Sequence, residues 1–542
     1  MGERLEADVV VIGSGPSGSI VTHTLATAGV DVVCLEQGDW INPSDFGTNE
    51  PEWELSIQQR WAHDPNVRMA PADYPVEVSD SDMWPVMLNA VGGTSLFYGA
   101  EWVRLMASDF RLRSSEGICD DWPISYAELK PFHDEVDAFL GVAGVGGDPA
   151  YPEGLDYPMP PHPIGKVGMK AAEGVNKLGW HWWPGVNAIA VNRHKTLERC
   201  LRHGVCEWGC PAGAKASFDL IYLPQAIAAG ARLLTGARVS RIESGPDGLA
   251  TGAHFVDREG EENFVAAKAV VVCANGIGTP RLLLLSDGPA HPDGLANSSG
   301  LVGKNLMLHP NCTVTGYYDE DLESWKGPVG ESIHSMEFYE TRPEHDFVRG
   351  GKMNVLPTPG PLAAVEAHRD QPFDQVWGPA FADVAARHRS GILWATNTED
   401  LPEETNRVTL DPTLTDGDGV PAPKVSYRIS DNTRRILDFH VERMTELHEA
   451  SGASEMIAVD VWLDQPGHLL GTARMGDDPE RSVVDSYGRA HDVPNLFVAD
   501  GSIFVTGGAA NPTSTITALA LRIAKHIVAT AAERPTAGGV AR

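Results

Sequence analysis

The chain has 542 residues, a length that favours two domains over one. Of these residues 42% are hydrophobic and 21% charged, which is the ordinary composition of a globular protein. Its 42 Lys and Arg are outnumbered by 74 Asp and Glu, which gives a net charge of -32. A chain this acidic repels phosphate groups, which argues against binding to nucleic acids or to anionic membrane surfaces. Seven cysteines, an odd number in a long chain, argue against a secreted disulfide framework.

The first 36 residues have the pattern of a nucleotide-binding βαβ unit. A short apolar strand over residues 7–12 leads into a G-x-G-x-x-G turn over 13–18, a helix follows, and a second strand ends at Glu36. Such a turn lets the backbone approach a pyrophosphate at the helix N-terminus, and the acid can hold ribose hydroxyls. The unit predicts a dinucleotide with an unphosphorylated ribose, and leaves FAD and NAD both open.

The middle of the chain divides into segments of different character. A second glycine turn over 89–95 could approach a ligand closely or be purely structural. Pro and Gly crowd residues 146–165, which favours a loop or lid. Residues 232–276 alternate in hairpin fashion and end in a buried strand, whereas about 311–464 carries no nucleotide motif and is the expected substrate domain.

Dense motifs return near the C-terminus. His468 precedes a glycine turn, a strand from residue 495 ends in Asp-Gly at 500–501, and Asn511 and Pro512 suit the start of an apolar helix. A helix N-terminus aimed at a flavin would favour negative charge on the reduced ring. From these residues alone, a packed core role for His468 and a helix-cap role for Asn511 are the favoured interpretations.

Together these motifs resemble the glucose–methanol–choline (GMC) oxidoreductase family from end to end. The matching segments are residues 13–36, 92–95, 121–126, 274–285, 302–306, 468–476 and 511–513. The resemblance implies an α/β fold, with a Rossmann-like FAD-binding domain of the p-hydroxybenzoate-hydroxylase-like type and a substrate domain built on a mostly antiparallel sheet with covering helices. We expect a discontinuous FAD domain over 1–310 and 465–542, with a loop and cysteine-rich insertion at about 146–216, and a substrate domain over 311–464.

The resemblance also implies the chemistry, in which a hydride passes from a carbinol carbon to flavin N5. The family histidine that serves as base or hydrogen-bond partner for the substrate hydroxyl matches His468, and the second His or Asn matches Asn511. Such a group needs a pKa near neutrality within hydrogen-bond reach of the hydroxyl. The Asn-Pro-Thr ending is similar to the pyranose-oxidase and choline-oxidase branches, so we expect oxidation of a secondary alcohol of a sugar or glycoside to a ketone.

Site residues follow from the matching motifs. We expect the cofactor to contact Gly13, Gly15, Pro16, Ser17, Gly18, Glu36, Gly92, Gly93, Thr94, Ser95, Val239, Ala274, Asp500, Gly501, Pro512 and Thr513. Trp462, Asp464 and Gln465 are the expected substrate contacts. Some pyranose oxidases attach FAD through a histidine where this chain has Phe97, so we expect non-covalent FAD; Tyr98 replaces an asparagine of many family members.

Three cysteines, Cys200, Cys206 and Cys210, resemble a segment of bacterial FAD-dependent sugar and gluconate dehydrogenases, some of which bind an iron–sulfur cluster there. Thiolates at this spacing could ligate iron, or two of them could form a disulfide. We favour a packed loop without a metal, because three cysteines suffice only for a trinuclear cluster.

Several alternatives stay open. The substrate could be a non-sugar alcohol such as choline or an aliphatic or sterol-like alcohol, the enzyme could be a hydroxynitrile-lyase-like protein with structural FAD, or the chain could be an electron-transfer subunit. The electron acceptor is oxygen or another compound, and a homo-oligomer or a small companion subunit fits equally. The first strand begins too early for a signal peptide, and the apolar residues 516–528 include Arg522 and Lys525, so we expect a cytoplasmic protein without a membrane span.

Overall fold

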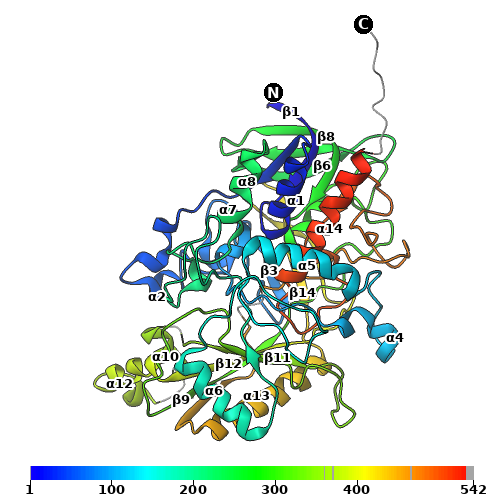
Figure 1. Cartoon of the computed structure of the whole chain (residues 1–542). Coiled ribbons are helices and arrows are strands. Elements are labelled where there is room, and N and C mark those ends of the chain that lie inside the picture. The colour runs from blue at the N-terminus through cyan, green and yellow to red at the C-terminus, as the bar shows by residue number, and fades with distance from the viewer. Residues whose placement is uncertain (1, 359, 369–371, 464–466, 533–542) are drawn as a thin grey trace.

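The computed structural model describes residues 2–358, 360–368, 372–463 and 467–532 (Figure 1). Two large sheets organise the chain, one in the upper half of Figure 1 around β1 and β8 and one in the lower half around β11 and β12. The α/β class that the motifs predict is confirmed.

The upper sheet has seven strands in the order β5-β2-β1-β8-β7-β6, with β16 also paired to β8. Its strands are β1 (Arg4–Ile12), β2 (Val32–Glu36), β5 (Arg232–Thr235), β6 (Arg238–Ser244), β7 (Ala250–Val256), β8 (Glu262–Val272) and β16 (Leu496–Val498). β5, β2, β1, β8 and β16 pair in parallel, whereas β6, β7 and β8 form an antiparallel meander. Residues 9–12 and 32–36 are buried throughout, as parallel strands covered on both faces require.

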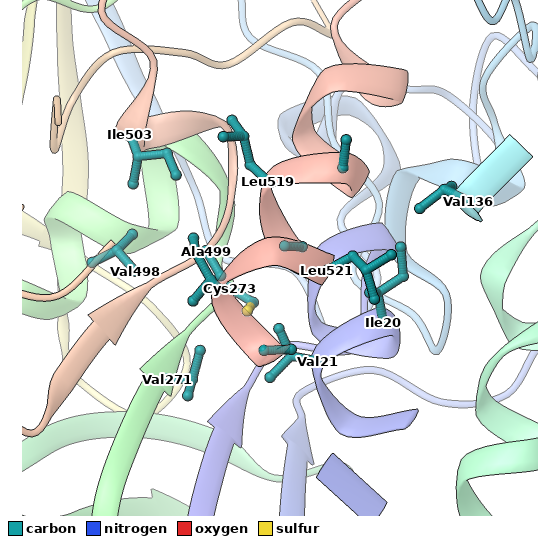
Figure 2. Packing of buried hydrophobic residues seen from close by; sticks show 14 of the residues in the cluster. Ile20, Val21, Val136, Val271, Cys273, Val498, Ala499, Ile503, Leu519 and Leu521 are labelled. Atoms are coloured by element: carbon teal, nitrogen blue, oxygen red, sulfur yellow. The ribbon is translucent and has the colours of Figure 1, made fainter. Parts of the chain in front are cut away.

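Three helices pack together beside this sheet: α1 (Pro16–Thr27), α5 (Tyr126–Leu140) and α14 (Thr513–Ala532). Figure 2 shows Val21 of α1 near Leu521 of α14 and the end of β8 at Val271. The apolar face that the sequence predicts for α14 is buried at Leu519 and Ile523. Because β1 ends at Ile12 and α1 begins at Pro16, this packing directs the N-terminus of α1 to the carboxyl edge of the sheet.

The lower sheet has six strands in the order β15-β9-β12-β11-β10-β4, and its neighbouring strands are antiparallel. Its strands are β4 (Trp183–Pro184), β9 (Asn311–Tyr317), β10 (Ile333–Ser335), β11 (Gly351–Leu356), β12 (Gly391–Thr398) and β15 (Glu455–Val459). Met353, Val355 and Trp394 point into a core with α6 (Gly165–Leu178) and α13 (Asp431–Ser451), which lie below the sheet in Figure 1. Since side chains alternate along a strand, the neighbours of these residues face the upper sheet.

A third, three-stranded sheet joins β3 (Glu77–Ser81), β14 (Pro421–Tyr427) and β13 (Arg407–Thr415). The remaining helices are α2 (Trp53–Ser56), α3 (Pro65–Arg68), α4 (Leu112–Glu116), α7 (Phe218–Ile221), α8 (Leu223–Ala228), α9 (Asn275–Leu285), α10 (Pro361–Ala367), α11 (Phe373–Val376) and α12 (Ala380–Ala386). Within the described ranges, no helix has the length and apolarity needed to cross a bilayer.

The proposed insertion at 146–216 is more than a loop. It contains α6, which packs on α13, and β4, which pairs with β10 at the edge of the lower sheet. We therefore propose the domain division at residue 311 with α6 and β4 added to the substrate-binding unit.

Candidate active site

One large cavity lies where the upper and lower sheets face each other, with about 2290 Å³ of space between atoms when its open mouth is included. Fourteen of the residues expected at the cofactor line it: Gly13, Gly15, Pro16, Ser17, Glu36, Gly93, Thr94, Ser95, Val239, Ala274, Asp500, Gly501, Pro512 and Thr513. His468, Asn511 and Trp462 line the same cavity, whereas Asp464 and Gln465 fall outside the described residues. The structure therefore brings the N-terminal and C-terminal motifs to one place.

Two glycine turns form a narrow cradle at one end of this cavity. Gly93 has φ +57°, and a Cβ on it would lie 2.9 Å from the Cα of Gly15. Gly13 has φ +95°, and its Cβ would lie 2.5 Å from the carbonyl oxygen of Cys273. Gly15 precedes α1 without a side-chain cap, so the first amides of the helix keep their hydrogens free for an anion.

Gly18 and Gly92 were expected at the cofactor and do not line the cavity. A Cβ on Gly18 would lie 1.9 Å from the carbonyl oxygen of Gly13, so this glycine lets α1 pack closely on the strand before it. Gly92 has φ +90° and donates its N–H to the carbonyl of Ser14 at 3.1 Å, so it joins the two turns. Both glycines shape the cradle from behind.

Glu36 is buried at the end of β2 beside this cradle. Its carboxylate accepts hydrogen bonds from the backbone N–H and hydroxyl of Ser14, at 2.9 and 2.7 Å, and from the N–H of Gly38 at 2.9 Å. Burial raises the pKa of Glu36, against the lowering effect of these donors. A carboxylate has lone pairs beyond these three bonds, so it can also accept from ribose hydroxyls.

His468 meets a second histidine in the cavity wall. Its Nδ1 lies 3.1 Å from Nδ1 of His309, and the two rings meet edge to face. Burial, His309 and the charge of Lys352 lower the pKa of His468 well below its ordinary value, and burial lowers that of His309 to about 4. The pKa of His468 therefore lies below the near-neutral value expected for the base, because burial disfavours the charged ring. Both imidazoles are neutral at neutral pH, and one must donate the hydrogen that they share.

The amide of Asn511 bonds to the lower sheet. Its Oδ1 accepts from Nδ2 of Asn397 on β12 at 3.2 Å. At the start of α14 the carbonyl of Pro512 accepts from the N–H of Ile516, so Asn511 lies outside the first turn of the helix. The helix-cap interpretation of Asn511 is therefore wrong; Pro512 occupies the cap position.

Comparison with known proteins decides the family. Family models described as GMC oxidoreductase match residues 8–311 and 402–520. The chain is a GMC oxidoreductase. It is 43% identical to a 2-methyl-1,2-propanediol dehydrogenase of Mycolicibacterium austroafricanum over 96% of this chain and 95% of that one, and 30% identical to the fructose dehydrogenase large subunit of Gluconobacter japonicus over 97% and 98%. A formate oxidase structure from Aspergillus oryzae, concerned with FAD modification, superposes with a TM-score of 0.65 at 16% identity over 98% of this chain and 99% of that chain.

This GMC oxidoreductase is an FAD-dependent enzyme that acts on the CH–OH group of donors. Its cradle fits FAD: the uncapped N-terminus of α1 suits the pyrophosphate, Glu36 suits the ribose, and a side chain on Gly93 would close the gap between the turns. Phe97 lines the cavity and carries no nucleophilic atom, and the hydroxyl of Tyr98 donates to the carbonyl of Ala216 at 2.9 Å. Non-covalent attachment stays a prediction.

Three residues of the lower sheet and one loop residue, Glu101, complete the cavity, and the sequence did not predict them. Glu101, Asn311, Asn354 and Asn397 line the cavity, and we call these four residues the polar wall. β9, β12 and β11 pair so that Asn311 is opposite Asn397, which explains why residues far apart in the chain share one surface. The sequence gives no direct signal for His309; it lies three residues after the family-matching segment 302–306.

The cysteine loop packs against the segment that follows the second glycine turn: Nζ of Lys215 donates to the carbonyls of both Cys206 and Leu96, and Glu207 lines the large cavity. Cys200, Cys206 and Cys210 line a second, small cavity, and all three thiols are free. Each sulfur accepts a backbone N–H, from Arg202, Val329 and Ala214 respectively, at 3.3 to 3.5 Å. Among the described residues no three His, Cys, Asp or Glu side chains are arranged to hold a metal ion. The three thiols form no disulfide with one another, and the packed loop stays the favoured interpretation.

Proposed function

We propose that this GMC oxidoreductase oxidises a secondary alcohol of a sugar or glycoside to a ketone, with His468 as the base and Asn511 as a hydrogen-bond partner of the substrate hydroxyl. The observation that carries the proposal is a neutral imidazole that shares one cavity with the FAD cradle and a polar wall. A sugar-oxidising relative, the fructose dehydrogenase large subunit, supports the substrate class.

The proposed mechanism assigns the proton to His468. For Nε2 of His468 to accept the hydroxyl proton, its Nδ1 must carry a hydrogen and donate it to Nδ1 of His309, 3.1 Å away. That bond would then hold the protonated ring in place. Since Oδ1 of Asn511 accepts from Asn397, its Nδ2 is left to donate to the substrate oxygen. Bound FAD, held without a covalent bond, supplies the hydride acceptor.

A second candidate substrate is a small non-sugar diol. The relative at 43% identity is named for 2-methyl-1,2-propanediol, and a polar wall suits any substrate with more than one hydroxyl. Both candidates are polyhydroxylated, so the proposal commits to a substrate with at least one hydroxyl besides the one oxidised.

Anaerobic mixing of the holoenzyme with sugars, glycosides, 1,2-diols, choline and monohydric alcohols tests the proposal through bleaching of the flavin absorption. We expect sugars, glycosides or 1,2-diols to bleach the flavin fastest at equal concentration. If only 1,2-diols react, the sugar assignment is wrong. If no alcohol reacts, a lyase with structural FAD replaces the oxidoreductase mechanism.

We propose a cytoplasmic location, and oxygen or another small electron acceptor. The relative named as a large subunit makes a small companion subunit a reasonable partner. Purification of the untagged native protein, followed by size-exclusion chromatography, would reveal such a subunit or a homo-oligomer as a larger mass.

A further inference from the structure

Glu101 lines the cavity as a carboxylate that two residues of β11 hold from behind. Its Oε2 accepts from Nζ of Lys352 at 2.7 Å, and its Oε1 accepts from Nδ2 of Asn354 at 2.9 Å. The side chain of Glu101 is 10% exposed and that of Lys352 is fully buried. These two bonds fix the position of the carboxylate while it lines the cavity.

The charge of Glu101 is balanced by a buried network on the far side of Lys352. Nζ of Lys352 also donates to Glu331 at 2.8 Å, and Glu331 lies 3.0 Å from Nδ1 of His334. Burial would lower the pKa of His334, but Glu331 and Asp148 raise it to about 9, so the ring is positive. The network thus contains three carboxylates, on Glu101, Glu331 and Asp148, and two cations, on Lys352 and His334, so most of its charge is balanced internally.

Unused hydrogen-bonding capacity remains on the cavity side. A carboxylate has about four acceptor sites, and Lys352 and Asn354 take two of those on Glu101. Oδ1 of Asn311, in the same wall, is buried and has no hydrogen-bond partner among the described residues. Because an unpaired buried acceptor is costly, a wall of this kind calls for a ligand that donates hydrogen bonds.

The wall also lies near the proposed reacting group. Asn397, which donates to Asn511, is the cross-strand neighbour of Lys352 in the register of β11 and β12. The charge of Lys352 is close enough to His468 to lower its pKa. Glu101, which bonds to Lys352, therefore lines the same cavity as His468 and Asn511, beside the strand pair that carries Asn397.

We propose that Glu101 is a specificity-determining residue that accepts a hydrogen bond from a second hydroxyl group of the substrate, so that the enzyme prefers 1,2-diols and sugars to monohydric alcohols. The inference rests on the proposed function for the identity of the reacting hydroxyl. A neutral hydroxyl suits the wall better than an ammonium group, since Lys352 already balances the carboxylate.

Binding of unreactive analogues tests the role of Glu101 without turnover. Pinacol has two tertiary hydroxyls and tert-butanol has one, and neither has a carbinol hydrogen to lose. Each is titrated into the holoenzyme while the flavin absorption is followed, with 1-amino-2-methyl-2-propanol as the ammonium analogue. We expect Glu101→Gln to weaken pinacol binding roughly 10- to 100-fold, the range for a hydrogen bond to a charged group, and tert-butanol binding less than about twofold.

Asp137→Asn is the matched control, because Asp137 is also a buried carboxylate bonded to a buried cation, Arg104, and neither residue lines the cavity. It should leave the ratio of the pinacol and tert-butanol Kd values unchanged. The inference is overturned if Glu101→Gln weakens both alcohols equally, if it weakens neither, or if the ammonium analogue loses more affinity than pinacol.

The same variants are then mixed anaerobically with 1,2-propanediol and 2-propanol, which share one secondary hydroxyl and differ in the second hydroxyl. We expect a raised KM for the diol, with its limiting rate of flavin reduction within about threefold of the wild type, because Glu101 does not take the proton. Failure of the proposed function shows as a flavin that no alcohol bleaches, whether or not pinacol binding depends on Glu101. Failure of this inference shows as a reducible flavin with equal losses for diol and monohydric alcohol.

Discussion

Replacing His468 by alanine should remove the proton acceptor and leave the cofactor site intact. The imidazole meets the rest of the protein through the 3.1 Å contact with His309, and the FAD cradle is built from other residues. A positioned general base contributes about 10²- to 10⁴-fold, so we expect the anaerobic rate of flavin reduction to fall by that factor. The loss corresponds to roughly 3–5 kcal/mol of barrier.

The variant should also lose some stability, because Nδ1 of His309 is left in a buried site without its partner. An unsatisfied buried group of this kind costs about 1–3 kcal/mol. His448→Ala is the matched control: His448 is a buried histidine on α13, its Nε2 bonds to the carbonyl of Val314, and it does not line the cavity. Its rate of flavin reduction should match the wild type although it is also destabilised.

The pH dependence gives an independent check on His468. Burial, His309 and Lys352 lower its pKa, so the neutral, proton-accepting form persists below the ordinary histidine pKa of about 6.5. The limiting rate of flavin reduction should be flat through neutrality and fall only on the acid side. The same lowered pKa stabilises the folded protein above about pH 6.5, and this contribution is lost as the pH falls through the unfolded and then the folded value.

Stopped-flow measurement with saturating substrate and equal FAD content separates these effects. A His468→Ala rate within threefold of the wild type would refute the assignment of the base. So would a reduction rate that falls as the pH rises through neutrality.

Three further predictions concern the cofactor site and the core. Gly93→Ala should weaken FAD binding about tenfold or more, since the added Cβ would lie 2.9 Å from Gly15. Gly300→Ala, at a similar φ of +67° with open space around it, should leave FAD binding unchanged. Equal FAD release by both variants would contradict the proposal that the two glycine turns hold the cofactor. Glu36→Gln should raise the Kd of FAD roughly 10-fold by fluorescence titration, and an unchanged Kd would limit Glu36 to holding Ser14 and Gly38. Leu519→Ala, in the core between α14 and α1, should lower the free energy of unfolding by about 2–5 kcal/mol in chemical denaturation, whereas the same change at Leu201, which is 58% exposed, should have little effect.

The nucleotide half of the site could be predicted because its signals are local. The turn over 13–18, α1 and Glu36 lie within 36 residues, and each has a backbone or hydrogen-bonding reason for its residue type. The substrate side has no such signal. Glu101 and Lys352 are 251 positions apart, and they meet only because a loop docks on β11.

Asn511 shows how an interpretation from the local sequence can differ from the tertiary structure. Read locally, Asn-Pro before an apolar helix is a cap and a first helical residue, and that interpretation is physically sound. The competing bond comes from Asn397, 114 positions away, and is fixed by the register of β12 with β9 and β11. The side chain of Asn511 could bond either to the backbone at the start of the helix or to the amide of Asn397, and only the tertiary structure decides between the two.

The buried charges behind the polar wall are expensive for the fold. Lys352 and Glu331 are fully buried, and well-packed apolar residues of similar volume would often be neutral or stabilising in their place. What such residues could not do is hold Glu101 as a rigid acceptor at the cavity surface, because an unpaired carboxylate there would take up a proton or rotate away. The network is therefore best understood as support for Glu101: Lys352 favours the ionised form against the burial that raises the pKa of Glu101 to about 6, and together with Asn354 it fixes the carboxylate where we propose that a second substrate hydroxyl binds.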